Sequence, residues 1–250
     1  MEKKKIENLY IKKIKELDKF NEHYYEHSKP LVDDSEYDFL KKEILTLEKR
    51  YKFLKSDLSP AKIVGFKPSK NFRKVSHQVP MLSLANAFSE DDLINFEKKI
   101  INYLDKKENF NIEFSAEPKI DGISASLIYK SGKFIMGLSR GDGKEGEDIT
   151  ENLATINDIP KVISSKDFPD EIDIRGEVFI QNSDFKNLND KFANPRNAAS
   201  GSLRQKNPND TKKIPLKFIA YTFGYEKGLL VKNQSDFISK LSKWGFKTNP

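Results

Sequence analysis

The chain contains no cysteine, and this absence excludes several classes of protein at once. Its 250 residues hold no disulfide framework, no cysteine zinc site and no thiol nucleophile. Histidine is almost as scarce, because only His23, His27 and His77 occur and their spacing completes no metal site. A long apolar run and a signal peptide are also missing. We therefore expect a protein without membrane segments in a reducing cytoplasm.

Charge is plentiful, but the excess of one sign is small. Lysine and arginine number 44 against 38 acidic residues, which gives a formal net charge of +6. A basic balance favours a polyanion such as nucleic acid as partner, although a solvated lysine-rich surface explains the composition equally well. The length suffices for one large domain or two small ones, and the apolar fraction of 37% suffices for a core.

Apolar residues recur at helical spacing in two adjacent segments near the N-terminus. The first covers residues 5–27. The second begins at Asp33 or Asp34, and Glu36 is placed to close a capping box from Asp33. We expect two antiparallel helices joined by a short loop, which together form a subdomain over residues 1–60.

A linker is expected after this helical pair. Residues 55–80 lack periodicity and are interrupted by proline and glycine, so we place a linker over 61–80. A third helix is expected over about 90–106, because Ser89 is a good N-cap and Asp92 stands at the capping-box position.

The second half of the chain has a strand pattern. Short runs typical of strands lie between turns, at residues 112–119, 123–130, 133–139, 172–180 and 215–224. Ser131-Gly132 predicts a hairpin turn. Further helices are expected from Asp148 or Thr150 to Ile156, at about 183–191 and from Asp236 to Trp244. The predicted fold class is α+β, with antiparallel sheets in a domain over 81–250 and no alternating βαβ series.

The segment from Glu117 to Gly122 places one lysine between two carboxylates, each two residues away. Alternate side chains of an extended segment share a face, so Glu117, Lys119 and Asp121 are expected to point the same way. A lysine becomes a nucleophile only after losing its proton, and neighbouring carboxylates stabilise the ammonium instead. The pattern fits a catalytic lysine whose activation needs a metal or cationic phosphate contacts. It fits a structural ion pair in a strand equally well.

Residues 139–148 contain the spacing G-x-G-x-x-G, which in a dinucleotide fold places a pyrophosphate at a helix N-terminus. We reject that interpretation, because acidic side chains fill the segment and no βαβ unit surrounds it. Arg140 is the better candidate, since its guanidinium is a planar donor fork suited to phosphate or ribose oxygens. Residues 192–205 are small and polar and include Arg196 and Arg204. They predict an ordered functional loop near a polyanion rather than core.

Aromatic and acidic residues gather where the two N-terminal helices meet, namely Tyr24, Tyr25, Asp34, Tyr37 and Asp38. Tyrosine rings could stack on a flat, electron-poor heterocycle, and the carboxylates could meet its cationic charge. Packed tyrosines at a capped helix start explain the same residues, and the residues alone favour that structural interpretation.

In their order along the chain, these segments resemble the N-terminal part of bacterial NAD-dependent DNA ligases, over essentially the whole chain. The resemblance is carried by Tyr24-Tyr25, Asp34-Ser35-Glu36-Tyr37-Asp38, Val79-Pro80-Met81-Leu82-Ser83-Leu84, Glu117-Pro118-Lys119-Ile120-Asp121-Gly122, Ser139-Arg140-Gly141-Asp142-Gly143, Arg175-Gly176-Glu177 and the run from Phe192 to Gln205. It implies a helical subdomain that binds the nicotinamide mononucleotide half of NAD, followed by a nucleotidyltransferase domain. It also implies NAD as co-substrate, Mg²⁺, nicked duplex DNA as partner, and a monomer.

The resemblance further implies roles for single residues. Lys119 would attack the adenylyl phosphorus of NAD to give lysyl-AMP, with Asp121 supporting the lysine and the leaving group. The residues implied at the nicotinamide half are Tyr24, Tyr25, Asp34, Ser35, Glu36, Tyr37 and Asp38. Those implied at the adenylate are Ser83 and Leu84 beside the adenosine, Glu117 at the adenine amino group, Glu177 at the ribose and Arg140 on the nucleotide. Arg196 and Arg204 would contact the AMP phosphate or the 5′-phosphate of the nick.

The family continues with D-G-V-x-x-K and K-F-P strands, whose lysines contact the nucleotide, and this chain ends before either. We therefore expect a truncated ligase that seals no nicks alone and self-adenylates weakly or not at all. An ATP-dependent K-x-D-G nucleotidyltransferase is one alternative, but it has no reason to carry the Tyr24 to Asp38 hairpin. A non-catalytic NAD-binding remnant is another, opposed by the intact Lys119, Asp121 and Arg140.

Overall fold

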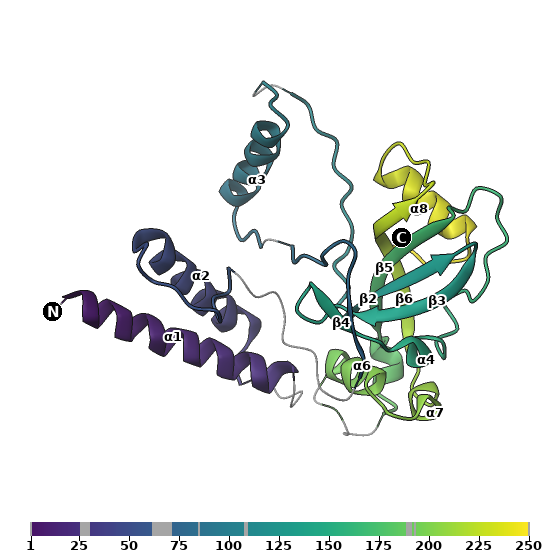
Figure 1. Ribbon diagram of the computed structural model, residues 1–250, viewed down its shortest axis with the longest axis horizontal. Coiled ribbons are helices and arrows are strands. Elements are labelled where there is room, and N and C mark those ends of the chain that lie inside the picture. The colour runs from purple at the N-terminus through teal and green to yellow at the C-terminus, as the bar shows by residue number, and fades with distance from the viewer. Residues whose placement is uncertain are drawn as a thin grey trace.

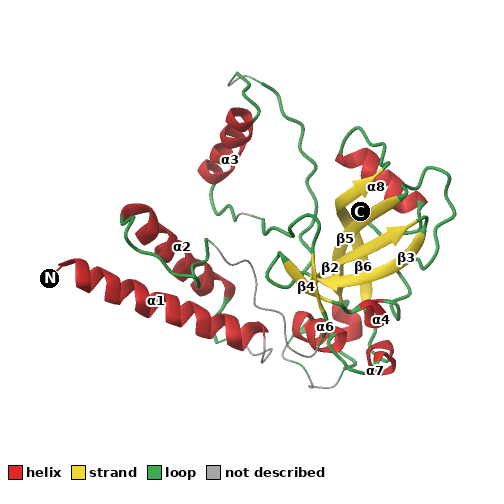
Figure 2. Cartoon of the chain, viewed as in Figure 1, coloured by secondary structure: helices red, strands yellow, loops and turns green. Residues whose placement is uncertain are grey.

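The computed structural model describes residues 2–25, 31–61, 72–84, 86–107, 110–188, 192 and 194–249. Figures 1 and 2 show a pair of N-terminal helices, a separate helix α3, and a strand-rich part that contains the C-terminus. No helix among the described residues is long and apolar enough to cross a membrane.

The N-terminal helices are α1 (Glu2–Tyr25) and α2 (Asp34–Arg50), and they pack side by side as the sequence predicted. Their shared core consists of Tyr10, Ile14, Leu17, Leu40, Ile44 and Leu54. Asp33 is the N-cap of α2, because its carboxylate accepts the Glu36 amide at 2.9 Å. This confirms the predicted start of the second helix.

The centre of the remaining chain is a four-stranded antiparallel sheet in the order β3-β2-β5-β6. Its strands are β2 (Ile123–Lys130), β3 (Lys133–Ser139), β5 (Glu171–Phe179) and β6 (Lys217–Lys227). Ser131 and Gly132 have φ values of 48° and 74°, the left-handed conformation that a two-residue hairpin turn requires. The structure thus confirms the α+β class and the predicted hairpin.

The two faces of β5 differ in chemistry. Ile172, Ile174 and Val178 belong to the main hydrophobic core, whereas Asp173, Arg175 and Glu177 alternate with them and face the other way. The short helices α4 (Thr150–Leu153), α6 (Pro195–Leu203) and α7 (Pro208–Lys212) accompany the sheet, as does α8 (Gln234–Lys243). α8 contributes Phe237 and Leu241 to the core. One face of the sheet is therefore available for a polar site.

Two segments differ from their prediction by gaining regular structure. The expected linker contains strand β1 (Lys74–Ser76), which pairs antiparallel with β4 (Glu145–Glu147), a strand that the glycine pattern obscured. The domain division itself stays a prediction, and residues 62–71 lie outside the described part.

Helix α3 (Glu90–Tyr103) starts after the N-cap Ser89, as expected. The helix expected at 183–191 is the short α5 (Asn182–Phe185), with 189–191 outside the described residues.

The strand predicted at residues 112–119 is absent, because the described residues from 110 to 122 contain no strand. A strand needs a hydrogen-bonded neighbour, and no described strand of the sheet pairs with these residues. The face-sharing expected for Glu117, Lys119 and Asp121 therefore has no strand to impose it.

The prediction of a loop outside the core at residues 192–205 is also wrong. Residues 195–203 form helix α6, because the Asn194 side chain accepts the Asn197 amide at 2.8 Å and Pro195 occupies the first turn. Ala198 and Ala199 on this helix are fully buried in the core. The Asn-Pro pair was a helix-start signal that the small, polar composition concealed.

Replacing Asn194 with alanine is expected to lower the free energy of unfolding by about 1 kcal/mol, the usual contribution of an N-cap side chain. Urea denaturation followed by the fluorescence of Trp244, which is buried in the same core, measures this. The exposed Asn157→Ala is the control and should change the free energy by less than about 0.5 kcal/mol. Equal effects of the two substitutions would contradict the capping role.

Candidate active site

The polar face of β5 holds a buried carboxylate, Glu177, which is 8% exposed. Its Oε2 accepts hydrogen bonds from the Ser124 hydroxyl at 3.0 Å and the Tyr221 hydroxyl at 3.5 Å. Burial raises the pKa of Glu177, whereas the Ser124 hydrogen bond and the charges of Arg196, Lys119 and Arg140 oppose that rise. Burial also raises the pKa of Tyr221, to about 12. Residues from distant parts of the sequence therefore act on one carboxylate.

Gly122 explains how the lysine segment reaches this face. A Cβ at residue 122 would lie 2.3 Å from the Val178 carbonyl oxygen and 2.9 Å from the Glu177 Cγ. Only glycine permits so close an approach, and the segment that ends in Gly122 is thereby held against β5. Lys119 itself is exposed, so its ammonium is accessible to a ligand over this face.

Asp121 and Arg196 form an ion pair, with 3.0 Å between Oδ1 and Nη1. Arg196 is the second residue of α6, so the buried alanines of that helix fix its position. The Asp121 side chain is 74% exposed and that of Arg196 is 23% exposed. A phosphate near Lys119 would therefore meet this arginine and its carboxylate partner together.

Arg140 stands on a tight turn between β3 and β4. Gly141 and Gly143 have φ values of 58° and 89°, so these glycines serve a turn that leads into strand β4 and not into a helix. The guanidinium is 3.5 Å from the Ser83 hydroxyl, which joins two predicted nucleotide residues. The Arg140 carbonyl oxygen is 3.2 Å from His77 Nε2, and burial lowers the pKa of that histidine. Because a carbonyl oxygen can only accept, His77 Nε2 donates this bond and helps to hold the backbone of the turn.

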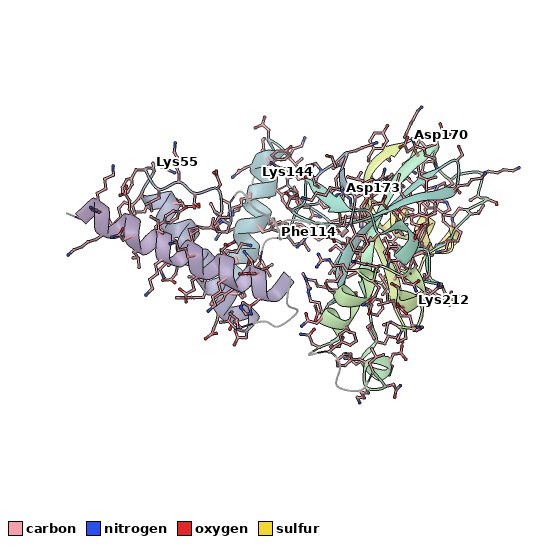
Figure 3. The ribbon with its side chains drawn as sticks, turned by 60° about the horizontal axis from the view of Figure 1, so that its bottom comes forward. Lys55, Phe114, Lys144, Asp170, Asp173 and Lys212 are labelled. Atoms are coloured by element: carbon pink, nitrogen blue, oxygen red, sulfur yellow. The ribbon has the colours of Figure 1, made fainter. Side chains whose placement is uncertain are left out.

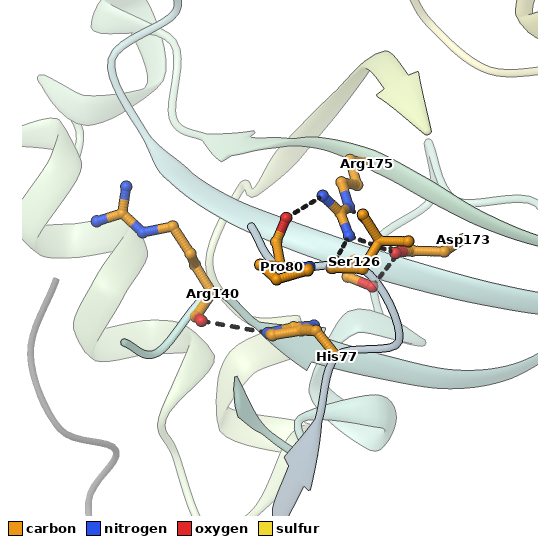
Figure 4. Close-up of polar contacts among 7 residues, drawn as sticks. His77, Pro80, Ser126, Arg140, Asp173 and Arg175 are labelled. Carbon is orange, nitrogen blue, oxygen red and sulfur yellow. Dashed lines mark hydrogen bonds and ion pairs between the residues drawn. The ribbon is translucent and has the colours of Figure 1, made fainter. Parts of the chain in front are cut away.

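A buried ion pair between Asp173 and Arg175 lies on the same face of β5, and Figure 4 shows its contacts. Arg175 donates from Nε and Nη2 to Asp173 Oδ2 at 3.1 and 2.9 Å, and Ser126 donates to the other carboxylate oxygen. Arg175 also donates to the carbonyl oxygens of Val79 and Pro80. The segment that carries Ser83 is thus tied to the sheet. Sequence reasoning missed this role of Arg175, although the i, i+2, i+4 spacing of charges in β5 was a usable signal.

Glu117 and Arg204 contact other protein side chains in the structure. Glu117 accepts hydrogen bonds from the side chains of Gln234 and Asn249, neither of which the sequence singled out. Arg204 is ion-paired with Glu147 at 3.0 Å, and the Glu147 side chain is fully buried. The structure therefore shows a structural contact for Arg204, and its expected phosphate contact stays a prediction.

The helical pair of α1 and α2 lies away from the polar face of the sheet. Figures 1 and 3 show α1 and α2 apart from the sheet, with Lys55 of the N-terminal part far from Asp173. Asp38 accepts a hydrogen bond from Asn86 at 2.6 Å, and the Tyr37 hydroxyl donates to Asn21. The side chains of Tyr24, Tyr25 and Asp34 lie outside the described residues. Ser35 and Glu36 are exposed at the start of α2, and Leu84 is 79% exposed.

The arrangement suits covalent chemistry on a phosphorylated ligand. It offers an exposed amine, cations suited to phosphate, and a buried carboxylate that can accept from ligand hydroxyls. The part of the chain that the structure describes contains no group of three or more metal-ligating side chains.

Comparison with known proteins identifies the two parts of the chain. Residues 69–250 match the family described as NAD-dependent DNA ligase adenylation domain. Residues 3–65 match the family described as DNA ligase-like, N-terminal NAD+-binding domain.

Curated relatives give the same result. The chain is 66% identical to the DNA ligase of Pelagibacter ubique over 250 residues, 100% of this chain and 37% of the relative. It is 46% identical to the DNA ligase of Parvibaculum lavamentivorans over 243 residues, 94% of this chain and 34% of the relative. The chain thus spans roughly a third of the length of these relatives. With a family match over residues 69–250 and a second over 3–65, the chain belongs to the NAD-dependent DNA ligases, of which it comprises the NAD+-binding and adenylation region.

Proposed function

We propose that the chain acts as the adenylation region of a ligase. This ligase joins a 5′-phosphate to a 3′-hydroxyl at nicks in duplex DNA and uses NAD as adenylate donor. The observation that supports this most is the shared neighbourhood of Lys119, Arg140 and Arg196 around one buried carboxylate, Glu177. These are the residues that adenylation requires: a nucleophile, phosphate-binding cations and an acceptor for ribose hydroxyls.

In the proposed reaction Lys119 Nζ attacks the adenylyl phosphorus, the bond to the bridging oxygen breaks, and nicotinamide mononucleotide leaves. The Lys119 ammonium gives its proton to solvent water before the attack, and Asp121, two residues later, helps to position the amine and the leaving group. AMP then passes from Lys119 to the 5′-phosphate of the nick, and the 3′-hydroxyl displaces it. Arg196 and Arg204 would bind the AMP phosphate or the nick phosphate, since an arginine fork matches phosphate oxygens.

The remaining residues would hold the two halves of NAD. Glu117 would accept from the adenine amino group, Glu177 would bind the ribose, and Ser83 and Leu84 would border the adenosine. The helical pair would bind the nicotinamide half through Tyr24, Tyr25, Asp34, Ser35, Glu36, Tyr37 and Asp38. Asp38 already has a hydrogen-bond partner in Asn86, so the carboxylate would exchange that partner for the ligand.

Mg²⁺ fits this site only as an ion shared with substrate. Asp121 is the exposed carboxylate beside Lys119 and is the residue that would hold it, with phosphate oxygens as further ligands. When bound, the ion would offset charge on the phosphoryl group. The proposal further includes nicked DNA as partner, a monomeric state and a cytoplasmic location, and the absence of cysteine fits the last of these.

A labelling experiment tests the donor. The 250-residue chain is incubated with NAD or with ATP, each carrying label on the adenylyl phosphate. We expect label on the protein from NAD only, and weakly, because the relatives contribute many residues beyond those matched here. Nicked DNA added afterwards should remain unsealed by this chain alone. Labelling by ATP and not by NAD would reverse the proposed donor, and robust adenylate transfer to nicked DNA would refute the expected dependence on further residues.

A further inference from the structure

Glu117 is held by two neutral amides from the C-terminal part of the chain. The Gln234 Nε2 donates to Glu117 Oε1 at 3.2 Å, and the Asn249 Nδ2 donates to Glu117 Oε2 at 3.1 Å. The Ser115 hydroxyl adds a longer contact to Oε1 at 3.4 Å. Both oxygens of the carboxylate are therefore fixed by donors that leave its negative charge in place.

Gln234 connects this carboxylate to the sheet. It is the first residue of α8, next to the N-cap Asn233, so the helix start determines where its side chain begins. Its Nε2 also donates to the Tyr221 carbonyl oxygen at 2.7 Å. Tyr221 belongs to β6, and its hydroxyl is 3.5 Å from Glu177 Oε2. Gln234 therefore fixes the position of Glu117 relative to the strand that borders the proposed ribose site.

Asn249 connects the same carboxylate to the nucleophile's backbone. Its Nδ2 donates both to Glu117 and, at 3.2 Å, to the Pro118 carbonyl oxygen, one residue before Lys119. Because both partners accept hydrogen bonds only, the amide can present only its nitrogen to them. The preceding residues are anchored, since Phe246 is 3% exposed and the Lys247 carbonyl oxygen accepts the Ala220 amide at 2.8 Å.

We propose that Gln234 and Asn249 are positioning residues that set the preference of this site for adenine. The inference rests on the proposed function, in which Glu117 accepts from the exocyclic amine of the base. Because amides hold both carboxylate oxygens of Glu117, the carboxylate cannot rotate away from a bound base. A base with a carbonyl oxygen in place of the amine therefore sets its own acceptor against the acceptor of Glu117, and the two repel. Discrimination arises from this repulsion as much as from the hydrogen bond to the amine.

Binding measurements on the 250-residue chain test this. Isothermal calorimetry compares NAD with nicotinamide hypoxanthine dinucleotide, in which a carbonyl replaces the amine. The variants are Gln234→Ala and Asn249→Ala, and the exposed Asn209→Ala is the control. We expect each test variant to lower the ratio of the two affinities by about tenfold, the scale of one hydrogen bond to a charged group, and the control to leave it unchanged.

The ratio separates positioning from folding, because loss of structure would weaken both dinucleotides equally. If an alanine variant has a lowered Tm, the near-isosteric Gln234→Glu and Asn249→Asp remove the donor and should lower the ratio as well. Equal weakening of both ligands in all variants would overturn the inference and leave the proposed function intact. A wild-type chain that binds neither dinucleotide would overturn both.

Discussion

A protein with arginine in place of Lys119 is expected to form no lysyl-AMP, a loss of at least about 10³-fold, the scale seen when a covalent nucleophile is removed. Arginine keeps the positive charge near Glu177 and Arg196, but its guanidinium stays protonated and attacks no phosphorus. Lys119 is exposed, so the fold should tolerate the change within about 0.5 kcal/mol. The Lys119→Arg protein would therefore lose lysyl-AMP formation and keep its fold.

A thousandfold loss can be measured only if the wild-type protein is labelled strongly, and the 250-residue chain alone is expected to be labelled weakly. A chimera in which residues 1–250 replace the matching part of the Pelagibacter ubique ligase provides a strong signal, because that relative is 66% identical over the whole chain. Label transferred from NAD to the protein, stable in alkali and lost in acid as a phosphoramidate requires, and sealing of nicked DNA are followed together. Lys144→Arg, on the exposed turn beside β4, is the matched control and should keep full activity. Labelling of the Lys119→Arg protein above about a hundredth of the wild-type level would show that another residue is the nucleophile.

Replacing Arg175 with methionine is expected to lower the free energy of unfolding by about 3–5 kcal/mol, because it leaves the buried Asp173 carboxylate without its counter-ion. The two side chains are 9% and 8% exposed, so water cannot replace the lost partner. The carbonyl oxygens of Val79 and Pro80 would lose their donors as well. This is the largest stability effect expected from a single side chain of the polar face.

A double substitution separates the ion pair from simple packing. Arg175→Met combined with Asp173→Leu removes both charges, and it should recover most of the stability lost in Arg175→Met alone. Urea denaturation followed by Trp244 fluorescence reports on this part of the molecule, since that residue is buried in its core. The salt bridge between Lys130 and Glu171 at the exposed end of the same strand is the comparison, and its loss should matter little. If Arg175→Met alone changes the free energy of unfolding by less than about 1 kcal/mol, Asp173 does not depend on this counter-ion.

Local patterns predicted those elements whose signals are local. The Ser131-Gly132 turn between two alternating runs predicted the β2–β3 hairpin, and Asp33 and Ser89 predicted the starts of α2 and α3. These succeed because capping and turn chemistry depend on a few adjacent residues. The roles of the residues around Glu177 came from the resemblance, since no local rule connects Lys119 to an arginine on α6.

The failures concern pairing and tertiary contact. The run at 112–119 has strand composition, but composition cannot supply a neighbouring strand, and none pairs with it among the described residues. The short β1 and β4 were missed for the opposite reason, since three residues carry almost no period. No structural role was predicted for Arg175, because its partners Val79 and Pro80 lie almost a hundred residues earlier in the sequence.

The ion pair between Asp121 and Arg196 changes how an anion would arrive at this site. A phosphate that binds an unpaired arginine releases only loosely held salt ions, whereas a phosphate that binds Arg196 would compete with the carboxylate of Asp121. Arrival is then an exchange of one anion for another, in which the protein's own side chain acts as the counter-ion. Occupancy of Arg196 should therefore depend less steeply on ionic strength than that of a bare cation. The displaced Asp121 would at the same moment become free for the lysine two residues before it.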